Sequence, residues 1–87
     1  MRAGEEHAAE EALRGVVPPS REEPGCVAID AFRALNDGRL FFIHSRWRDE
    51  AAFDEHAGLA HTVHFLARMT ALSDEPPDLV RVRPVTP

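Results

Sequence analysis

Cysteine is almost absent from the 87-residue chain, and lysine is missing altogether. The single cysteine, Cys26, excludes an internal disulfide, a CxxC redox motif and a cysteine-based zinc finger. A single thiol fits a reducing compartment, and we expect a cytoplasmic protein. All ten basic residues are arginines, which we attribute to genomic composition before any functional choice.

Long apolar runs are equally scarce, since the longest, Leu40–Ile43, has only four residues. A membrane span needs roughly 20, so we expect no membrane segment. The N-terminal sequence MRAGEEHAAEEAL is acidic and predicts no signal peptide. The net charge of −5 argues against nucleic acid as a partner, because phosphates need basic groups. Motifs of the GxGxxG, P-loop and GxSxG types are absent, which leaves nucleotide-dependent and serine-hydrolase chemistry without support.

What is present predicts one small globular domain over residues 1–87. The composition is 44% hydrophobic and 29% charged, which is ordinary for a folded domain. A chain of this length buries only about 60–65% of the surface that it exposes when unfolded, so its core is thin. A partner subunit is one common way to stabilise such a domain.

Periodicity predicts three elements in the first half of the chain. A helix over 4–17 has an apolar stripe and an acidic opposite face, and Pro18 and Pro19 are expected to end it. Alternating apolar residues predict strands over 26–33 and 39–47. The Asn-Asp-Gly sequence between them is typical of a hairpin turn.

The second half predicts a helix over 49–72, with Asp49 as its N-cap and a break or kink at Gly58, and a final strand over 79–85. The order helix, strand, strand, helix, strand indicates an α+β fold of the ferredoxin-like type with an antiparallel sheet, whose first strand is missing. That absence leaves a gap in the sheet unless the last strand slides over or a partner chain fills it.

Two segments carry a resemblance to a known family. Residues 20–26 read SREEPGC, and residues 44–65 read HSRWRDEAAFDEHAGLAHTVHF. An R-x-E-P-G-C-like turn before a strand, a Trp that ends the next strand, Asp-Glu-x-Ala, and two His and a Phe at fixed spacing recur in one family. The chain resembles the antibiotic biosynthesis monooxygenase (ABM) domain family over roughly residues 4–85. The matching residues are Trp47, Asp49, Glu50, Ala52, His56, His61 and Phe65.

The resemblance implies a dimeric α/β barrel, and therefore a homodimer. Some members oxidise quinols or phenols with O₂, so it implies a monooxygenase that acts on a small quinol or phenolic aromatic without a cofactor. Ser45 stands where the family usually has Glu, and the missing strand bears a key Asn in a heme-degrading branch, so the resemblance to that branch is weaker. An alternative is a non-catalytic dimeric module of the same fold, for small-ligand binding or interaction.

Trp47, His61 and His64 are the candidate catalytic residues. Trp47 is either a core aromatic or the wall of an apolar cavity that stacks an aromatic substrate. His61 and His64 lie about 60° apart on a helix and face together with Arg68. There an imidazole could accept a phenolic proton and the guanidinium could stabilise the anion, although each His is more simply a hydrogen-bonded or half-exposed helix residue. The candidate substrate-binding residues are Phe41, Ile43, Phe53, His56, Phe65, Arg68 and Met69.

No metal site is predicted, because zinc needs three or four ligands, the histidine spacing is not HExxH and no further ligand is indicated. Cys26 is interpreted as a small hydrophobe, since a reactive thiolate needs positive surroundings. Arg21 is either solvated or paired with a carboxylate that pins the turn, and Arg81 and Arg83 could pair with acids of the first helix or of a partner.

The outer strand face is expected to meet a second copy, with His44 at the interface or its rim. It carries apolar side chains that the chain's own helices do not cover, and such a patch is typical of an interface. These are Ala28, Phe32, Leu40 and Phe42. Two copies joined in this way are expected to leave a dry niche behind each sheet, with Trp47 and an imidazole at its edge.

Overall fold

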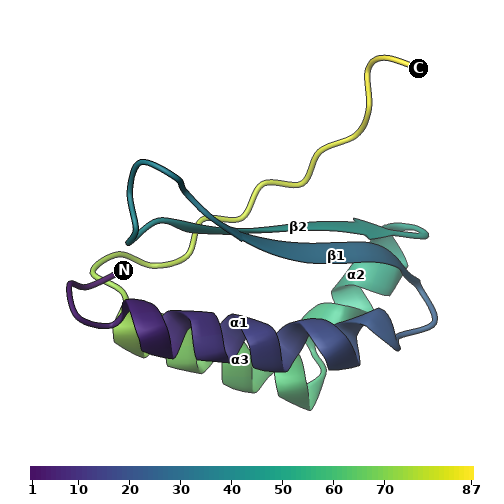
Figure 1. Cartoon of the computed structure of the whole chain (residues 1–87). Helices are drawn as coiled ribbons and strands as arrows, with labels where there is room; N and C mark the ends of the chain where they lie inside the picture. The colour runs from purple at the N-terminus through teal and green to yellow at the C-terminus, as the bar shows by residue number, and fades with distance from the viewer.

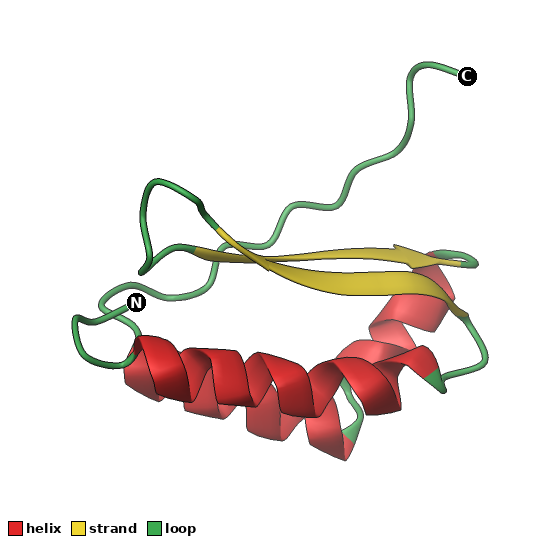
Figure 2. Cartoon of the chain, in the orientation of Figure 1, coloured by secondary structure: helices red, strands yellow, loops and turns green.

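Two antiparallel strands lie over a pair of long helices in the computed structural model, which describes all residues from 1 to 87 (Figures 1 and 2). Helices α1 and α3 run side by side beneath the sheet, and the short helix α2 lies where β2 ends (Figure 1). The elements are α1 (Glu6–Arg21), β1 (Cys26–Arg33), β2 (Phe41–Trp47), α2 (Glu50–Ala57) and α3 (Ala60–Leu72).

Helix α1 buries its apolar stripe beneath the sheet, but it does not end at Val17 as predicted. It continues through Pro18 and Pro19 to Arg21. A proline ring fixes φ near −65°, which a helix accepts, and the cost is a missing N–H for the carbonyl four residues earlier. The Ser20 hydroxyl donates a hydrogen bond of 2.8 Å to the Val16 carbonyl, which ties the turn that contains the prolines. The buried stripe comprises Ala9, Ala12, Leu13, Val16 and Val17.

The sheet is the predicted hairpin, with β1 and β2 antiparallel. On the face toward the helices, Ile29 pairs with Ser45 and Cys26 pairs with Trp47. A β-bulge between Cys26 and Ala28 inserts one residue, which keeps both pairs on the same face. The hairpin therefore points Trp47 toward the helices at the end of β2.

The helix predicted over 49–72 is two helices. The Asp49 carboxylate accepts a hydrogen bond of 2.8 Å from the Ala52 N–H, so the predicted N-cap of α2 is confirmed. Helix α2 ends at Gly58, and Leu59 adopts an extended backbone before α3 begins. Of the two alternatives predicted at Gly58, the break is the one that occurs, and it turns α3 back beneath the sheet (Figure 2).

The strand predicted over 79–85 does not form in the single chain. The segment after α3 extends to the C-terminus without a strand partner (Figure 1). Alternating side chains favour a strand, but a strand also needs a neighbour for its backbone hydrogen bonds. Arg81 pairs with Asp54 at 2.7 Å and with Glu50 at 3.5 Å, both on α2 and not on the first helix as considered above.

The core is thin, as its length predicts, and only 12 of 87 residues are buried. One cluster joins α1 to α3 through Ala9, Ala12 and Met69, with Phe41 and Phe65 packed against it. A second joins α1 to β1, through Val16, Val17 and Ile29. None of the helices combines the length and the apolar character needed to cross a bilayer.

Candidate active site

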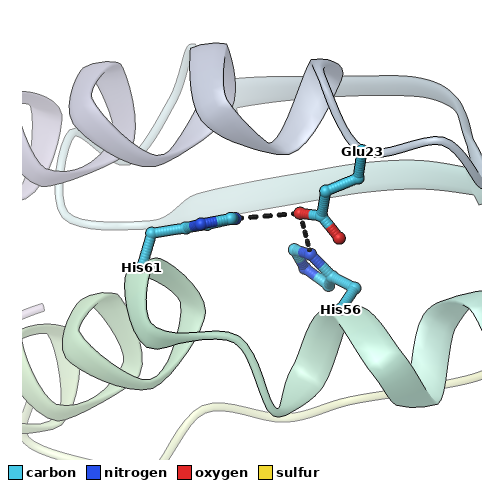
Figure 3. A group of neighbouring side chains, drawn as sticks. All are labelled: Glu23, His56 and His61. Atoms are coloured by element: carbon cyan, nitrogen blue, oxygen red, sulfur yellow. Dashed lines mark hydrogen bonds and ion pairs between the residues drawn. The ribbon is translucent and has the colours of Figure 1, made fainter.

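A carboxylate from the α1–β1 loop bridges imidazoles that belong to two different helices. The Oε2 atom of Glu23 lies 2.8 Å from His56 Nδ1 and 2.8 Å from His61 Nε2 (Figure 3). The side chains of Glu23 and His56 are only 11% and 10% exposed, whereas that of His61 is 29% exposed. This Glu23–His56–His61 cluster is therefore open to solvent mainly at His61.

Side-chain and backbone hydrogen bonds fix the loop that carries Glu23. The Cys26 N–H donates to the Glu23 carbonyl at 3.0 Å and closes a tight turn. The Arg21 guanidinium donates to the Ile29 carbonyl at 3.0 Å and to the Asp30 carboxylate at 2.8 Å. Of the two roles considered for Arg21, pairing with a carboxylate at this turn is confirmed.

Gly25 allows the same loop to lie directly on α2. A Cβ atom at this position would clash with the Cβ of Ala52. The Gly25 carbonyl accepts a hydrogen bond of 2.8 Å from the Arg48 N–H, just before the first turn of α2. This close approach brings His56, further along α2, within reach of Glu23.

Trp47 forms an aromatic wall beside the cluster. Its ring centroid lies 4.4 Å from that of His56, with the ring planes 31° apart, and Phe53 meets it nearly edge-on at 6.1 Å. The indole N–H donates to the Ser45 hydroxyl at 3.0 Å. Ser45, which stands where the family that the sequence resembles usually has Glu, thus fixes the orientation of the indole.

The hydrogen bonds decide which imidazole nitrogen is free to react. A carboxylate oxygen accepts only, so His56 Nδ1 and His61 Nε2 carry the protons that face Glu23. The other nitrogen of neutral His61, Nδ1, then has a lone pair. A carboxylate behind a histidine orients the ring and stabilises the imidazolium that forms when the ring takes a proton. The arrangement can therefore accept a proton at His61 Nδ1.

A hollow of about 60 Å³ opens beside the cluster. Pockets for small molecules typically enclose about 300–1,000 Å³. The single chain thus lacks the roomy niche expected behind the sheet, because Phe41, Phe65 and Met69 fill the space against α1. A larger hollow of about 370 Å³ lies between α1 and β1, and Trp47 is not among the residues that line it. Its walls are charged and include Glu10, Arg14, Arg21 and Asp30. The walls of the small hollow are Glu23, Pro24, Gly25, Trp47, Arg48, Ala52, Glu55 and Leu59.

Part of the predicted site comes together in space. Trp47, His56 and His61 gather at the cluster, and Phe53 lies beside Trp47. The centroids of the two imidazole rings are 6.1 Å apart. These residues belong to β2, α2 and α3, and the corner at Gly58 is what allows the two histidines to converge.

The remaining predicted residues lie elsewhere. Phe41, Phe65 and Met69 pack in the core, as described above. His64 is exposed although it follows His61 by nearly one turn, so the two imidazoles do not share surroundings. Arg68 and Ile43 are exposed as well.

Glu23 is the residue that sequence reasoning missed. It lies 33 and 38 residues from its two histidine partners, and the Arg-Glu-Glu run resembled a solvated loop. The available signal was the R-x-E-P-G-C pattern, in which the glycine after Glu-Pro indicates a close approach to another element.

Cys26 fits the role of a small hydrophobe. It packs against the Val16, Val17 and Ile29 cluster. Burial raises the pKa of its thiol, the negative charge of Glu23 raises it further, and Arg21 partly opposes both. A raised pKa leaves little thiolate at neutral pH, which does not suit a nucleophile.

Comparison with known families tests the resemblance found in the sequence motifs. A family model described as "Antibiotic biosynthesis monooxygenase" (ABM) matches residues 1–68. The chain belongs to the ABM family. The resemblance drawn from the sequence motifs is thus confirmed, and it covers the hairpin, α2 and most of α3.

Named relatives of this ABM chain agree with the family match. "Putative monooxygenase YcnE" of Bacillus subtilis is 34% identical over 68 residues, which are 78% of this chain and 72% of the relative. "Putative monooxygenase Rv0793" of Mycobacterium tuberculosis is 31% identical over 64 residues, 74% of this chain and 62% of the relative. The matched part thus spans roughly two thirds of the relatives' length.

Solved structures share the fold of this ABM chain. PA3566 from Pseudomonas aeruginosa superposes with a TM-score of 0.70 at 38% identity, over 74% of this chain and 65% of that one. Rv0793 superposes with a TM-score of 0.82 at 26% identity, over 98% of this chain and 89% of that one. These likenesses confirm the α+β, ferredoxin-like fold with an antiparallel sheet. The second superposition also includes most of the segment after α3.

Proposed function

We propose that this ABM-family chain is a cofactor-independent monooxygenase that oxidises a small phenolic or quinol aromatic with O₂. The observation that carries the proposal is the Glu23–His56–His61 cluster, in which His56 packs on the indole of Trp47 and His61, the carboxylate-supported base, lies 6.1 Å from His56. Family membership supplies the reaction class. Phenols suit this site, because they offer a flat ring for stacking and an acidic O–H for the base.

Catalysis begins with transfer of the phenolic proton to His61 Nδ1, while Glu23 holds the opposite N–H. The electron-rich phenolate passes one electron to O₂, and the resulting aryloxyl radical and superoxide combine at a ring carbon. The peroxide takes the proton back from His61. His61 then removes the hydrogen of that carbon as a proton while the O–O bond breaks, and the departing hydroxide receives this proton and leaves as water. One naphthol and one O₂ thus give one naphthoquinone and one water, without an external reductant.

Oxygen uptake tests this function. The purified chain is incubated with 1-naphthol or menadiol in an oxygen electrode, with parallel anaerobic samples. We expect uptake above the protein-free rate, and with 1-naphthol one quinone formed for each O₂ consumed. Absence of uptake above the protein-free rate with several phenols would contradict the proposal.

We further propose that the working form is a homodimer joined through the outer face of the hairpin. Phe32 and Phe42 pair across the strands and are 53% and 51% exposed, so the chain's own helices leave this face uncovered. The C-terminal segment adds exposed Leu79, Val80 and Val82 without a strand partner. Such a segment can pair with the free strand edge of a second copy, which would add walls to the small hollow beside Trp47.

The dimer has a direct test in analytical ultracentrifugation. At micromolar concentration we expect a dimer, because a stable interface buries more than roughly 1,200 Å² and this face offers apolar side chains for it. Phe42→Asp places a charge in the interface and should give a monomer. Leu66→Asp changes a residue of α3 that is 42% exposed and should leave the dimer intact. A monomeric wild-type chain, or equal effects of both substitutions, would overturn the arrangement.

The small size of the hollow favours one alternative, a non-catalytic dimeric module that binds a small ligand or another partner. The same measurements separate the two functions. A dimer that quenches its Trp47 fluorescence on addition of 1-naphthol, yet consumes no O₂, would support the module and exclude the oxidation.

A further inference from the structure

We propose that Glu23, His56 and His61 form a binding site for a divalent transition-metal cation such as Zn²⁺. The three potential ligand atoms come from the α1–β1 loop, α2 and α3, and all lie within 4.8 Å of one another. Figure 3 shows both imidazoles directed at the same carboxylate oxygen. Binding of the metal does not depend on the oxidation proposed for this chain.

The kinds of atom in the cluster indicate which cations it takes. Two imidazole nitrogens and one carboxylate oxygen suit Zn²⁺, Co²⁺, Ni²⁺ or Fe²⁺. Mg²⁺ and Ca²⁺ prefer sites made of oxygen atoms, and this cluster provides only one such side chain. With three protein ligands, a fourth position would remain for water at the solvent-exposed side of His61.

The cluster must rearrange in two ways to accept such an ion. Bonds of about 2.0–2.1 Å in a tetrahedral site separate neighbouring ligand atoms by about 3.3 Å. The two nitrogen–oxygen distances are 2.8 Å, so each would lengthen by about half an ångström. The ligand atoms spread over up to 4.8 Å, so the two imidazole nitrogens would also move toward each other. Each imidazole would also carry its proton on the opposite nitrogen, which leaves the lone pair facing the ion.

Charge gives a second, independent argument. The Glu23 side chain is 11% exposed, and its ion-pair partners are His56 and His61 only. The nearby guanidinium groups are engaged elsewhere, since Arg21 pairs with Asp30 and Arg48 with Asp49. A largely buried carboxylate without a permanent cation is stabilised by a bound positive ion.

Occupation by a metal would exclude the catalytic role of His61. The ion would take the lone pair of Nε2, so the ring proton would sit on Nδ1, the atom that must accept the phenolic proton. Zn²⁺ is therefore expected to inhibit oxygen uptake. This consequence rests on the proposed function, whereas binding of the ion does not.

Isothermal titration calorimetry and Co²⁺ absorption test the site on the full chain after dialysis against EDTA. We expect one Zn²⁺ per chain, visible Co²⁺ bands of a nitrogen- and oxygen-ligated ion, and a higher Tm with Zn²⁺. Two variants keep the hydrogen bond to Glu23 while removing the metal-binding nitrogen: His61→Gln, whose amide replaces Nε2, and His56→Asn, whose amide replaces Nδ1. Each should weaken Zn²⁺ binding at least about 100-fold, because loss of a direct ligand exceeds the 10–100-fold typical of outer-shell changes.

Matched controls are Glu22→Gln, beside Glu23 but exposed, and His7→Ala, on the exposed side of α1. Both should bind Zn²⁺ like the wild type. Circular dichroism of each metal-free variant verifies folding. The proposal is overturned if the wild type binds no Zn²⁺, if binding survives in both His61→Gln and His56→Asn, or if His7→Ala abolishes it. None of these results bears on oxygen uptake by the metal-free chain, so the two proposals fail separately.

Discussion

Replacement of His61 by alanine is expected to lower the rate of oxygen uptake with 1-naphthol by about 10²–10⁴-fold, the usual contribution of a general base. The variant lacks the Nδ1 acceptor of the more exposed imidazole, and the remaining His56 is buried, so little of the phenol is deprotonated to pass an electron to O₂. His61→Gln should lose as much, because its amide preserves the bond to Glu23 but is not basic. The rates are measured in an oxygen electrode at saturating substrate.

Two further variants and a rescue experiment test whether the loss is specific to the imidazole of His61. His7→Ala should retain the wild-type rate, since that imidazole is exposed on α1 and remote from the cluster. Added imidazole should partly restore the rate of His61→Ala, which a merely structural role would not allow. A large loss in His64→Ala together with an unchanged rate in His61→Ala would instead identify the exposed imidazole as the base.

Gly25→Ala is expected to lower the free energy of unfolding by about 1–3 kcal/mol, the range for an added methyl group in a packed place. The added Cβ would clash with the Cβ of Ala52, so the loop and α2 must separate. The φ angle of Gly25 is not positive, so contact, and not backbone conformation, causes the loss. Separation should also lengthen the hydrogen bond between Glu23 and His56, and the variant should lose activity.

Gly15→Ala is the matched control. A Cβ there meets no atom within 4 Å, and the residue lies inside α1. Alanine is favoured over glycine in a helix interior, so stability should rise by about 0.8–1 kcal/mol. Urea unfolding at 25 °C compares both variants with the wild type. A Gly25→Ala chain as stable as the wild type would contradict the close packing of the loop on α2.

The sequence predicted those parts of the fold that depend on residues close together in the chain. The hairpin and the Asp49 cap are of this kind, since turn residues and a capping side chain act over a few residues. The end of α1 was predicted wrongly, because proline weakens a helix without forbidding it and tertiary packing decided the outcome. The segment over 79–85 has the pattern of a strand, but pairing depends on a distant partner that a pattern does not reveal.

In the candidate site, too, some residues could be predicted from the sequence and others could not. Motif spacing identified Trp47, His56 and His61, which the structure brings together. It also grouped His64 with His61, on the assumption that residues nearly one turn apart share surroundings. Glu23 went unrecognised because its partners lie on two helices whose relative direction is set by the corner at Gly58. Periodicity describes one helix at a time and does not give the angle between two.

The consecutive prolines of α1 leave two backbone carbonyls without their usual helical hydrogen bonds. Neither Pro18 nor Pro19 has an N–H, so the carbonyls of Arg14 and Gly15 receive no bond from the residue four positions on. The helix nevertheless continues to Arg21, and the Ser20 hydroxyl adds a hydrogen bond to the Val16 carbonyl in the last turn. Arg14 and Gly15 are exposed, so water can hydrogen-bond their free carbonyls, and α1 passes through both prolines at little cost. This last turn carries the chain to the point from which Glu23 reaches both imidazoles.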